Sequence, residues 1–315
     1  MYLITGANGQ LGRCISALLP TDNTILTDVC ASCEDGRKVE ALDITNVVAV
    51  KDFVKINHID CIINCAAYTA VEKAEDEEEL AFLINAVGPK NLGLSGAQTI
   101  IHVSTDYVFD GKAYRPLTPD DKVNPVSAYG RTKLKGEKEL LAHASGNVAI
   151  IRTSWLYSNY GNNFVKTMRR LGAERPSLNV VADQVGTPTF AEDLAQTIVA
   201  VIDGIEHHMV KLENKSDVQA GQTSLNSKSE EQNHELVREI YHFSNEGVCS
   251  WYDFAVAIME GSGLSCKVMP IPSSAFPTKT KRPFYSVLDK TKIKAQYGIE
   301  IPHWQESLKK CLSQF

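Results

Sequence analysis

The chain has 315 residues, of which 43% are hydrophobic and 22% charged, so it can form one large globular domain or two closely joined ones. Its formal net charge of -6 argues against a nucleic-acid partner or an anionic membrane partner. No run of about 18 apolar residues is present, and no charged leader precedes the first apolar segment. We therefore expect a cytoplasmic protein that acts on a small molecule.

A short apolar strand is predicted at residues 2–5, and it is followed by glycines at positions 6, 9 and 12 and then by an amphipathic helix. Glycines in such a turn let a pyrophosphate approach the backbone and let the helix pack close to the sheet. The first gap is one residue longer than in the standard dinucleotide fingerprint. The residues expected to contact a dinucleotide here are Gly6, Asn8, Gly9, Gln10, Leu11 and Gly12.

The second predicted strand ends at Asp28, where a carboxylate can bind the ribose hydroxyls of adenosine. An acid at this position favours NAD over NADP because it repels a 2'-phosphate. Arg13, Arg37 and Lys38 could offset that repulsion, so NAD(H) and NADP(H) both remain open. The structural alternative for Asp28 is a simple strand-end turn residue.

Two further turns complete the predicted cofactor site. Asp43, with Ile44, either contacts the adenine or caps the following helix. Ala66 and Ala67, followed by Tyr68, come directly after a buried strand, where small residues let a flat cofactor lie against the backbone.

Candidate catalytic residues lie on a strand over residues 99–104 and a helix over residues 127–144. The strand delivers Thr105 and Asp106 to the carboxyl edge of the sheet, where doubly wound sheets bind ligands. Tyr129 and Lys133 are four residues apart, so they share one face of the helix. We expect the Lys133 ammonium to lower the pKa of the Tyr129 phenol, and Thr105 to hydrogen-bond the same substrate oxygen.

Alternation of strands and helices over the first 150 residues predicts an α/β fold, a Rossmann-like doubly wound parallel sheet with a smaller C-terminal substrate-binding lobe. The NAD(P)-binding domain is expected over residues 1–152, with residues 186–206 and about 238–246 returning to it. The lobe is expected over residues 153–185 and 247–315. Residues 207–237 are polar and without periodicity, which predicts an inserted flexible loop, with a partner contact as the alternative.

The eight cysteines include Cys30 and Cys33, whose two-residue gap is also typical of a zinc or redox pair. Several of the others lie in apolar segments, where a thiol behaves as a small hydrophobic group. We therefore expect reduced structural thiols and assign no metal site.

The order of these motifs resembles that of the extended short-chain dehydrogenase/reductase superfamily. The motifs are Gly6-x-x-Gly9-x-x-Gly12, Asp43-Ile44-Thr45, Cys65-Ala66-Ala67, Ser104-Thr105-Asp106 and Tyr129-x-x-x-Lys133. Within the superfamily, five further stretches are similar to the dTDP-4-dehydrorhamnose reductase family, and they span nearly the whole chain: residues 69–75, 103–111, 152–157, 183–189 and 282–289.

This resemblance implies reduction of the C4 ketone of dTDP-4-dehydro-L-rhamnose to dTDP-L-rhamnose by hydride from NAD(P)H. On this interpretation Tyr129 gives the proton, Lys133 lowers its pKa and holds the nicotinamide ribose, and Thr105 binds the reacting oxygen. The related 4,6-dehydratases place a glutamate where this chain has Tyr107, so dehydration would lack its base.

The resemblance also implies substrate contacts. Trp155 would pack against a sugar ring, or else belong to the core, and Arg282 suits a diphosphate. Asp106 and Gln184 complete the expected substrate-binding set, with Thr153 and Asn163 as weaker candidates.

Other functions remain open at this point. The same fold serves other nucleotide-sugar reductases or epimerases, and also a non-catalytic dinucleotide-binding regulatory subunit. The partner expected for the enzyme is a dTDP-sugar. A homodimer is the assembly that the resemblance implies, in some relatives with magnesium at its interface, but Glu192 alone does not support a metal site.

Overall fold

The computed structural model describes residues 1–31, 36–220 and 236–315. At its centre lies a seven-stranded sheet in the order β11-β6-β5-β4-β1-β2-β3, and every neighbouring pair is parallel. The order reverses between β1 and β4, which is the switch point where such sheets bind ligands. The predicted doubly wound α/β fold is confirmed. In chain order the strands are β1 (Tyr2–Thr5), β2 (Thr24–Asp28), β3 (Val39–Ala41), β4 (Cys61–Asn64), β5 (Thr99–Thr105), β6 (Asn147–Thr153) and β11 (Arg238–His242).

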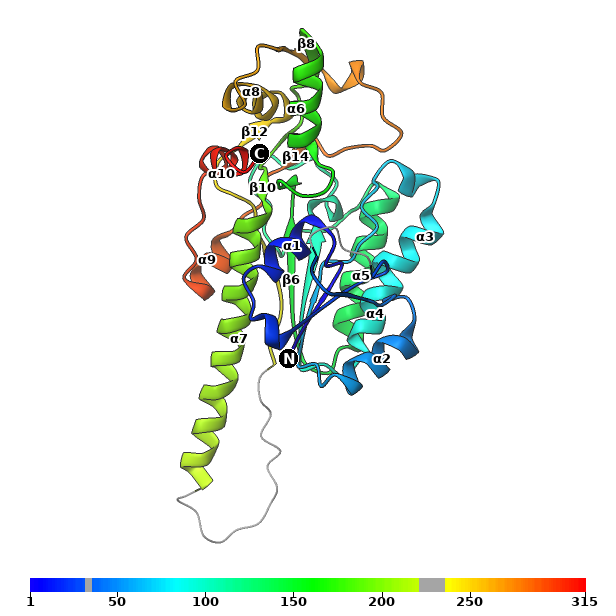
Figure 1. The fold of residues 1–315 in the computed structure, drawn as a ribbon, viewed down its shortest axis with the longest axis vertical. Coiled ribbons are helices and arrows are strands. Elements are labelled where there is room, and N and C mark those ends of the chain that lie inside the picture. Colours follow the sequence, from blue (N-terminus) through cyan, green and yellow to red (C-terminus); the bar gives the residue numbers. More distant parts are fainter. Residues whose placement is uncertain (32–35, 221–235) are drawn as a thin grey trace.

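Helices cover both faces of this sheet (Figure 1). Helices α1 (Gln10–Ser16) and α7 (Ala191–Ala220) pack together on one face, and α2 (Val47–Ile56), α4 (Gly88–Gly93) and α5 (Ala128–His143) cover the other. The strands are apolar on both sides for this reason: Ile101 of β5 packs in the core beneath α1 and α7, and Ile100 packs in the opposite core.

A smaller lobe lies beyond the carboxyl ends of the strands, at the top of Figure 1. Helices α6 (Phe164–Glu174), α8 (Trp251–Gly261) and α10 (Trp304–Leu312) share a separate hydrophobic core there. Helix α8 begins at a capping box in which Ser250 and Asp253 bond reciprocally. The lobe's strands pair as β7 (Leu156–Tyr157) with β10 (Thr189–Phe190), β8 (Ser177–Val181) with β13 (Lys267–Ile271), and β9 (Val185–Gly186) with β12 (Cys249–Ser250) and β14 (Tyr285–Ser286).

The polar segment after residue 206 differs from the predicted loop. Helix α7 continues through residues 207–220 to Ala220, and beyond the body of the molecule (Figure 1). Residues 205–220 contain neither glycine nor proline, so nothing in the sequence stops the helix. The part of the predicted loop between residues 221 and 235 lies outside the described residues. Helix α9 (Thr291–Tyr297) packs beside α7 and β11.

Two smaller features were not predicted. Strand β3 is only three residues long and carries little sequence signal. The acidic stretch around residues 75–79 lies in a broken helical segment, which consists of a 3-10 turn (Lys73–Glu75), α3 (Glu78–Phe82) and a π-helical turn (Leu83–Val87) before α4. The π turn places the buried side chain of Asn85 on the backbone of Tyr68, where it both accepts from the amide and donates to the carbonyl.

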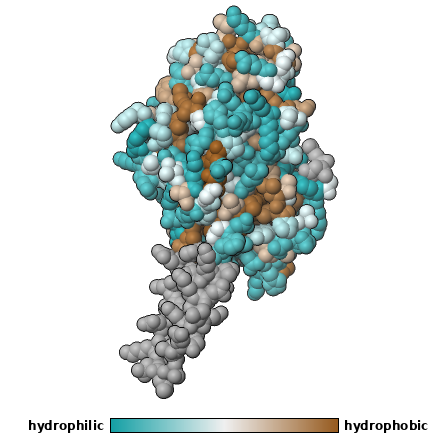
Figure 2. All heavy atoms as spheres, turned by 90° about the vertical axis from the view of Figure 1, so that its left-hand side faces the viewer, coloured by the Kyte–Doolittle hydropathy of each residue, from teal (hydrophilic) through white to brown (hydrophobic). Residues whose placement is uncertain are grey.

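The surface in the view of Figure 2 is mainly hydrophilic, with hydrophobic residues gathered in separate groups. Within the described ranges, no helix combines the length and the apolar character that crossing a bilayer requires.

Candidate active site

A cavity of about 690 Å³ lies at the carboxyl edge of the central sheet, facing the lobe. It brings together the glycine turn after β1, the ends of β2, β4 and β5, helix α5 and the first residues of the lobe. Most of the predicted site residues line it: Gly6, Gly9, Gln10, Leu11, Gly12, Asp28, Asp43, Ile44, Ala66, Ala67, Thr105, Asp106, Tyr129, Lys133 and Trp155. The weaker candidates Thr153 and Asn163 line it too.

The glycine turn fits closely between two strands. Gly6 has a φ of 70°, and a Cβ there would lie 2.6 Å from the amide nitrogen of Ala66. A Cβ on Gly12 would lie 2.5 Å from the carbonyl oxygen of Gly6. Both positions therefore require glycine, and the backbone is left open to the cavity in the way that a bound pyrophosphate needs.

Asp28 ends β2 at the cavity wall. Its carboxylate accepts hydrogen bonds from the backbone amides of Asn8, at 3.1 Å, and Val29, at 2.8 Å. The side chain of Asn8 is directed elsewhere, donating to the carbonyl of Cys30 at 2.9 Å. Asp28 therefore fixes the glycine turn and also presents a carboxylate to the cavity.

Asp43 lines the cavity and does not cap the following helix. Its carboxylate accepts from the amide and hydroxyl of Thr45, at 2.9 and 2.8 Å. The N-cap of α2 is Asn46, which accepts from Val48 and Ala49. Of the two alternatives that the sequence left open for Asp43, helix capping is thus wrong.

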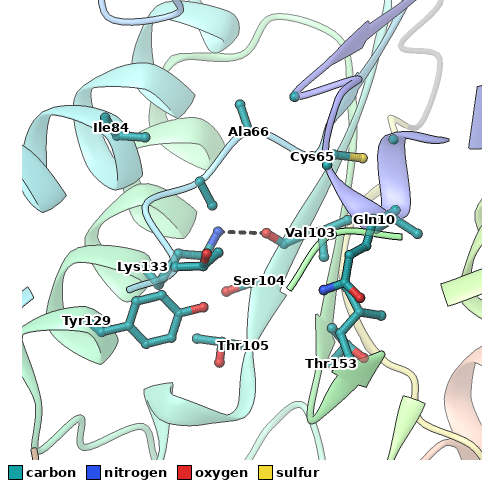
Figure 3. A pocket seen from close by; sticks show the side chains of 18 of the residues that line it. Gln10, Cys65, Ala66, Ile84, Val103, Ser104, Thr105, Tyr129, Lys133 and Thr153 are labelled. Atoms are coloured by element: carbon teal, nitrogen blue, oxygen red, sulfur yellow. Dashed lines mark hydrogen bonds between the residues drawn. The ribbon is translucent and has the colours of Figure 1, made fainter. Parts of the chain in front are cut away.

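Tyr129 and Lys133 point into the cavity from one face of α5, opposite Thr105 at the end of β5 (Figure 3). The Lys133 ammonium donates a 2.7 Å hydrogen bond to the carbonyl of Val103. Burial lowers the pKa of Lys133 to about 8, while the nearby Glu137 carboxylate acts to raise it.

The pKa of Tyr129 moves in the opposite direction from the one predicted. Burial raises it to about 12, and a hydrogen bond with Thr105 opposes the rise. The Lys133 ammonium is directed to Val103 rather than to the phenol, which explains why desolvation decides the outcome. The phenol is therefore a protonated donor over the whole physiological range.

Asp106 is a buried carboxyl in the cavity wall. Its Oδ1 accepts a 3.1 Å hydrogen bond from the Thr105 hydroxyl. Burial raises the pKa of Asp106 to about 6, and hydrogen bonds from Ser286 and Thr105 act against the rise. Asp106 thus orients the hydroxyl of Thr105 beside the Tyr129 phenol.

Trp155 forms the lobe side of the cavity in an unusual backbone conformation. Its φ is 50°, which is rare for a bulky residue, and its indole stacks on Trp251 with ring centroids 3.6 Å apart. A Cβ on Gly186 would lie 2.9 Å from the Trp155 ring, so that glycine makes room for it. A strained aromatic residue at a cavity wall is typical of a functional position.

The glycine turn and the lobe are joined by hydrogen bonds that the sequence did not predict. The side-chain oxygen of Gln10 accepts from Ser158 at 3.1 Å and from Asn163 at 2.9 Å. Asn163 also caps α6, accepting from Lys166. A glycine- and asparagine-rich run at residues 159–163, between a strand and a helix, was the signal for this turn. Further lining residues that were not predicted as site residues include Val29, Thr45, Cys65, Val103, Ser154, Gly161 and Asn162, of which Thr45 and Cys65 belong to the motifs quoted above.

Four predicted site residues lie outside the described lining of the cavity, namely Asn8, Tyr68, Gln184 and Arg282. The hydroxyl of Tyr68 donates to Glu77 at 2.5 Å, and Gln184 is buried. The guanidinium of Arg282 pairs with Glu72 at 2.9 Å.

The described part of the chain contains no group of three or more side chains able to hold a metal ion. Cys33, one member of the alternative zinc pair, lies outside the described residues. Within the described residues, Cys14, Cys61, Cys65, Cys249, Cys266 and Cys311 form no disulfide.

A parallel sheet with a glycine turn at its switch point, a strand-end threonine and a Tyr-x-x-x-Lys helix defines a dinucleotide-dependent oxidoreductase of the short-chain dehydrogenase/reductase type. The whole chain, residues 1–315, matches the family model described as the RmlD substrate binding domain, and the chain belongs to this family.

Relatives and solved structures agree with this assignment. The chain is 38% identical over 317 residues to dTDP-4-dehydrorhamnose reductase of Aggregatibacter actinomycetemcomitans, covering 98% of this chain and 96% of that protein. It is 35% identical over 323 residues to the spore coat polysaccharide biosynthesis protein SpsK of Bacillus subtilis (strain 168), covering 99% and 96%.

A crystal structure of a dTDP-4-dehydrorhamnose reductase from Clostridium acetobutylicum superposes with a TM-score of 0.82 at 44% identity, covering 99% of this chain and 98% of that one. The Bacillus anthracis reductase in complex with NADP gives 0.82 at 34% identity, covering 100% and 99%. The predicted family and the predicted class, an NAD(P)-dependent oxidoreductase, are confirmed.

Proposed function

We propose that this protein reduces the C4 ketone of dTDP-4-dehydro-L-rhamnose to dTDP-L-rhamnose with hydride from NADPH or NADH. The observation that supports the proposal best is the convergence of Thr105, Tyr129 and Lys133 on a cavity that also contains the glycine turn. The names of the relatives, dTDP-4-dehydrorhamnose reductases, give the substrate.

The cofactor fits one side of the cavity. Gly6, Gly9 and Gly12 leave the space that a pyrophosphate needs, Asp28 and Asp43 lie where the adenosine would rest, and Ala66 and Ala67 offer a flat wall. When bound, the reduced nicotinamide supplies the hydride. Both NADP(H) and NAD(H) remain proposed cofactors, since two backbone amides already share the charge of the Asp28 carboxylate.

Proton delivery falls to Tyr129. Its phenol is protonated at neutral pH and lies within hydrogen-bond reach of Thr105, so it can give its proton to the oxygen at C4 as the ketone becomes an alcohol. The Thr105 hydroxyl, which donates to Asp106 in the free protein, turns its single proton to the same oxygen when the sugar binds. The Lys133 ammonium, bonded to the carbonyl of Val103 at the cavity wall, is placed to hold the nicotinamide ribose.

The sugar and diphosphate occupy the lobe side in this proposal. Trp155, backed by Trp251, offers an aromatic face to the C-H bonds of the sugar ring. Asp106 and Gln184 remain proposed sugar contacts. Arg282 remains the proposed diphosphate contact, and its guanidinium would leave Glu72 to reach the phosphates. A homodimer, with or without magnesium at its interface, also remains a prediction.

The test is the loss of reduced-nicotinamide absorbance when the purified protein meets dTDP-4-dehydro-L-rhamnose generated in the assay. Wild type should consume the cofactor, and Tyr129→Phe should slow it about a hundredfold or more while binding the cofactor normally. The control is Tyr114→Phe, because Tyr114 is exposed on the surface. A wild-type protein that binds cofactor but turns over neither this nor related ketosugars would instead support the regulatory-subunit alternative.

A further inference from the structure

Below the cavity, a buried ion pair ties α5 to the sheet. Arg152 of β6 donates to the carboxylate of Glu137 through Nε at 2.9 Å and through its terminal nitrogen at 2.7 Å. The hydroxyl of Ser104 donates to the same carboxylate at 2.5 Å. Glu137 is 1% exposed and Arg152 2% exposed, so this charge pair lies wholly inside the protein.

The strand residues bonded to Glu137 directly precede residues that line the cavity. Ser104 and Arg152 are direct neighbours across β5 and β6, and the residues that follow them, Thr105 and Thr153, line the cavity. Glu137 therefore bonds both strands at the residues one position before Thr105 and its neighbour on β6.

On α5 the same spacing continues over about two turns. Tyr129, Lys133 and Glu137 recur every four residues, so they lie on one face of the helix. Lys133 bonds the carbonyl of Val103, and Glu137 bonds Ser104. One helix face is thus fastened to consecutive residues of β5.

We propose that Glu137 is a positioning residue. It holds α5 so that Tyr129 and Lys133 lie opposite Thr105, and its negative charge keeps Lys133 in its ammonium form. Arg152 holds the Glu137 carboxylate in place. The inference rests on the proposed function, because it assigns the support for that reaction's proton donor.

The other groups that face Lys133 are neutral. The Cys65 thiol, after β4, has its pKa raised to about 12 by burial. His102, on β5, has its pKa held well below the ordinary value, first by burial and then by Lys133 itself. The Tyr129 phenol is also protonated. Among the described groups that influence the pKa of Lys133, Glu137 is therefore the one that carries a negative charge. That charge opposes the lowering of the Lys133 pKa by burial.

Two substitutions separate placement from charge. Glu137→Asp keeps the carboxylate on a side chain that is one methylene group shorter. We therefore expect kcat to fall about tenfold, while the pH at which kcat declines stays as in wild type. Glu137→Gln removes the negative charge that favours the Lys133 ammonium, so the alkaline decline of kcat should move to lower pH by on the order of one unit.

The matched control is Glu139→Gln, also on α5, where the glutamate pairs with Lys135 near the surface. Its pH profile should equal that of wild type. If Glu137→Gln fails to fold because Arg152 is left unpaired, the double variant Glu137→Gln/Arg152→Met avoids a lone buried charge. It should still show the decline at lower pH than wild type.

A decline at the wild-type pH in folded Glu137→Gln or in the double variant overturns the charge role, and an unchanged kcat in Glu137→Asp overturns the placement role. Should wild type itself be inactive, the proposed function fails separately. NADPH affinity, measured against pH by nicotinamide fluorescence, then gives the same comparison. The alkaline loss of affinity should again come at lower pH in Glu137→Gln, and coincidence with wild type overturns the inference.

Discussion

The Nζ atom of Lys133 lies 2.7 Å from the carbonyl oxygen of Val103, the residue two positions before Thr105. This bond holds the ammonium at the end of β5, inside the protein, where Lys133 is 2% exposed. A buried ammonium loses its proton more easily than one in water, and the pKa of Lys133 is accordingly lowered to about 8.

The first prediction concerns the pH dependence of turnover. Below pH 8 Lys133 carries its charge, and above it the charge is lost, so kcat should decline as pH rises through about 8. The Tyr129 phenol, with a pKa raised to about 12, stays protonated throughout and does not produce this decline. The measurement is kcat at saturating substrates across the range from neutral to alkaline pH. A flat profile well beyond pH 8 would contradict the prediction.

A second prediction concerns Trp155. Replacing it with alanine removes the aromatic wall and the stack on Trp251, so KM for the nucleotide sugar should rise about tenfold, while Trp155→Phe keeps part of the effect. Initial rates against sugar concentration provide the measurement. The control is Trp304→Phe, because Trp304 is buried in the core of the lobe. Equal KM values for Trp155→Ala and wild type would show that Trp155 has only a core role.

A third prediction concerns the contact between α5 and the π-helical turn. A Cβ on Gly136 would lie 1.9 Å from the carbonyl oxygen of Asn85, which is backbone and cannot swing aside. Gly136→Ala should therefore lower the free energy of unfolding by about 1–3 kcal/mol or more. Lys138→Ala, on the exposed side of the same helix, should change it by less than about 0.5 kcal/mol. Urea denaturation compares the two, and equal stabilities would refute the close packing.

A fourth prediction concerns the segment at residues 278–283, which crosses from the lobe to the first domain. Glu72 accepts from the amide of Thr280 at 3.1 Å and pairs with Arg282, beside Val71 at the cavity wall. If Arg282 meets the diphosphate, Arg282→Ala should raise KM for the nucleotide sugar several-fold and leave KM for NADPH unchanged. Lys281→Ala, at an exposed neighbouring position, is the control. Equal effects of the two substitutions would count against a specific role for Arg282.

The sequence was sufficient wherever function depends on local spacing. The glycines at 6, 9 and 12, and the Tyr129-Lys133 pair on one helix face, follow from periodicity and the known geometry of strands and helices. The positions of Thr105 and Asp106 at the carboxyl edge follow from the apolar strand that precedes them.

Contacts between distant segments could not be predicted in this way. The bond between Glu137 and Arg152 depends on the register of β6 against β5, and the pair between Glu72 and Arg282 joins residues 210 positions apart. The pKa of Tyr129 was predicted in the wrong direction because spacing alone does not show where an ammonium points. The end of α7 escaped prediction because the sequence of residues 207–220 is mostly polar and shows no clear hydrophobic period.

The anchoring of α5 at Gly136 and Glu137 has a bearing on how this protein can change over generations. Since the helix is fastened to the sheet beyond Lys133, the outer part of the connection from β5 to α5, residues 110–122, is not needed to hold the proton donor in place. That outer part lies away from the cavity lining, so it can drift in sequence and length while the chemistry is inherited intact.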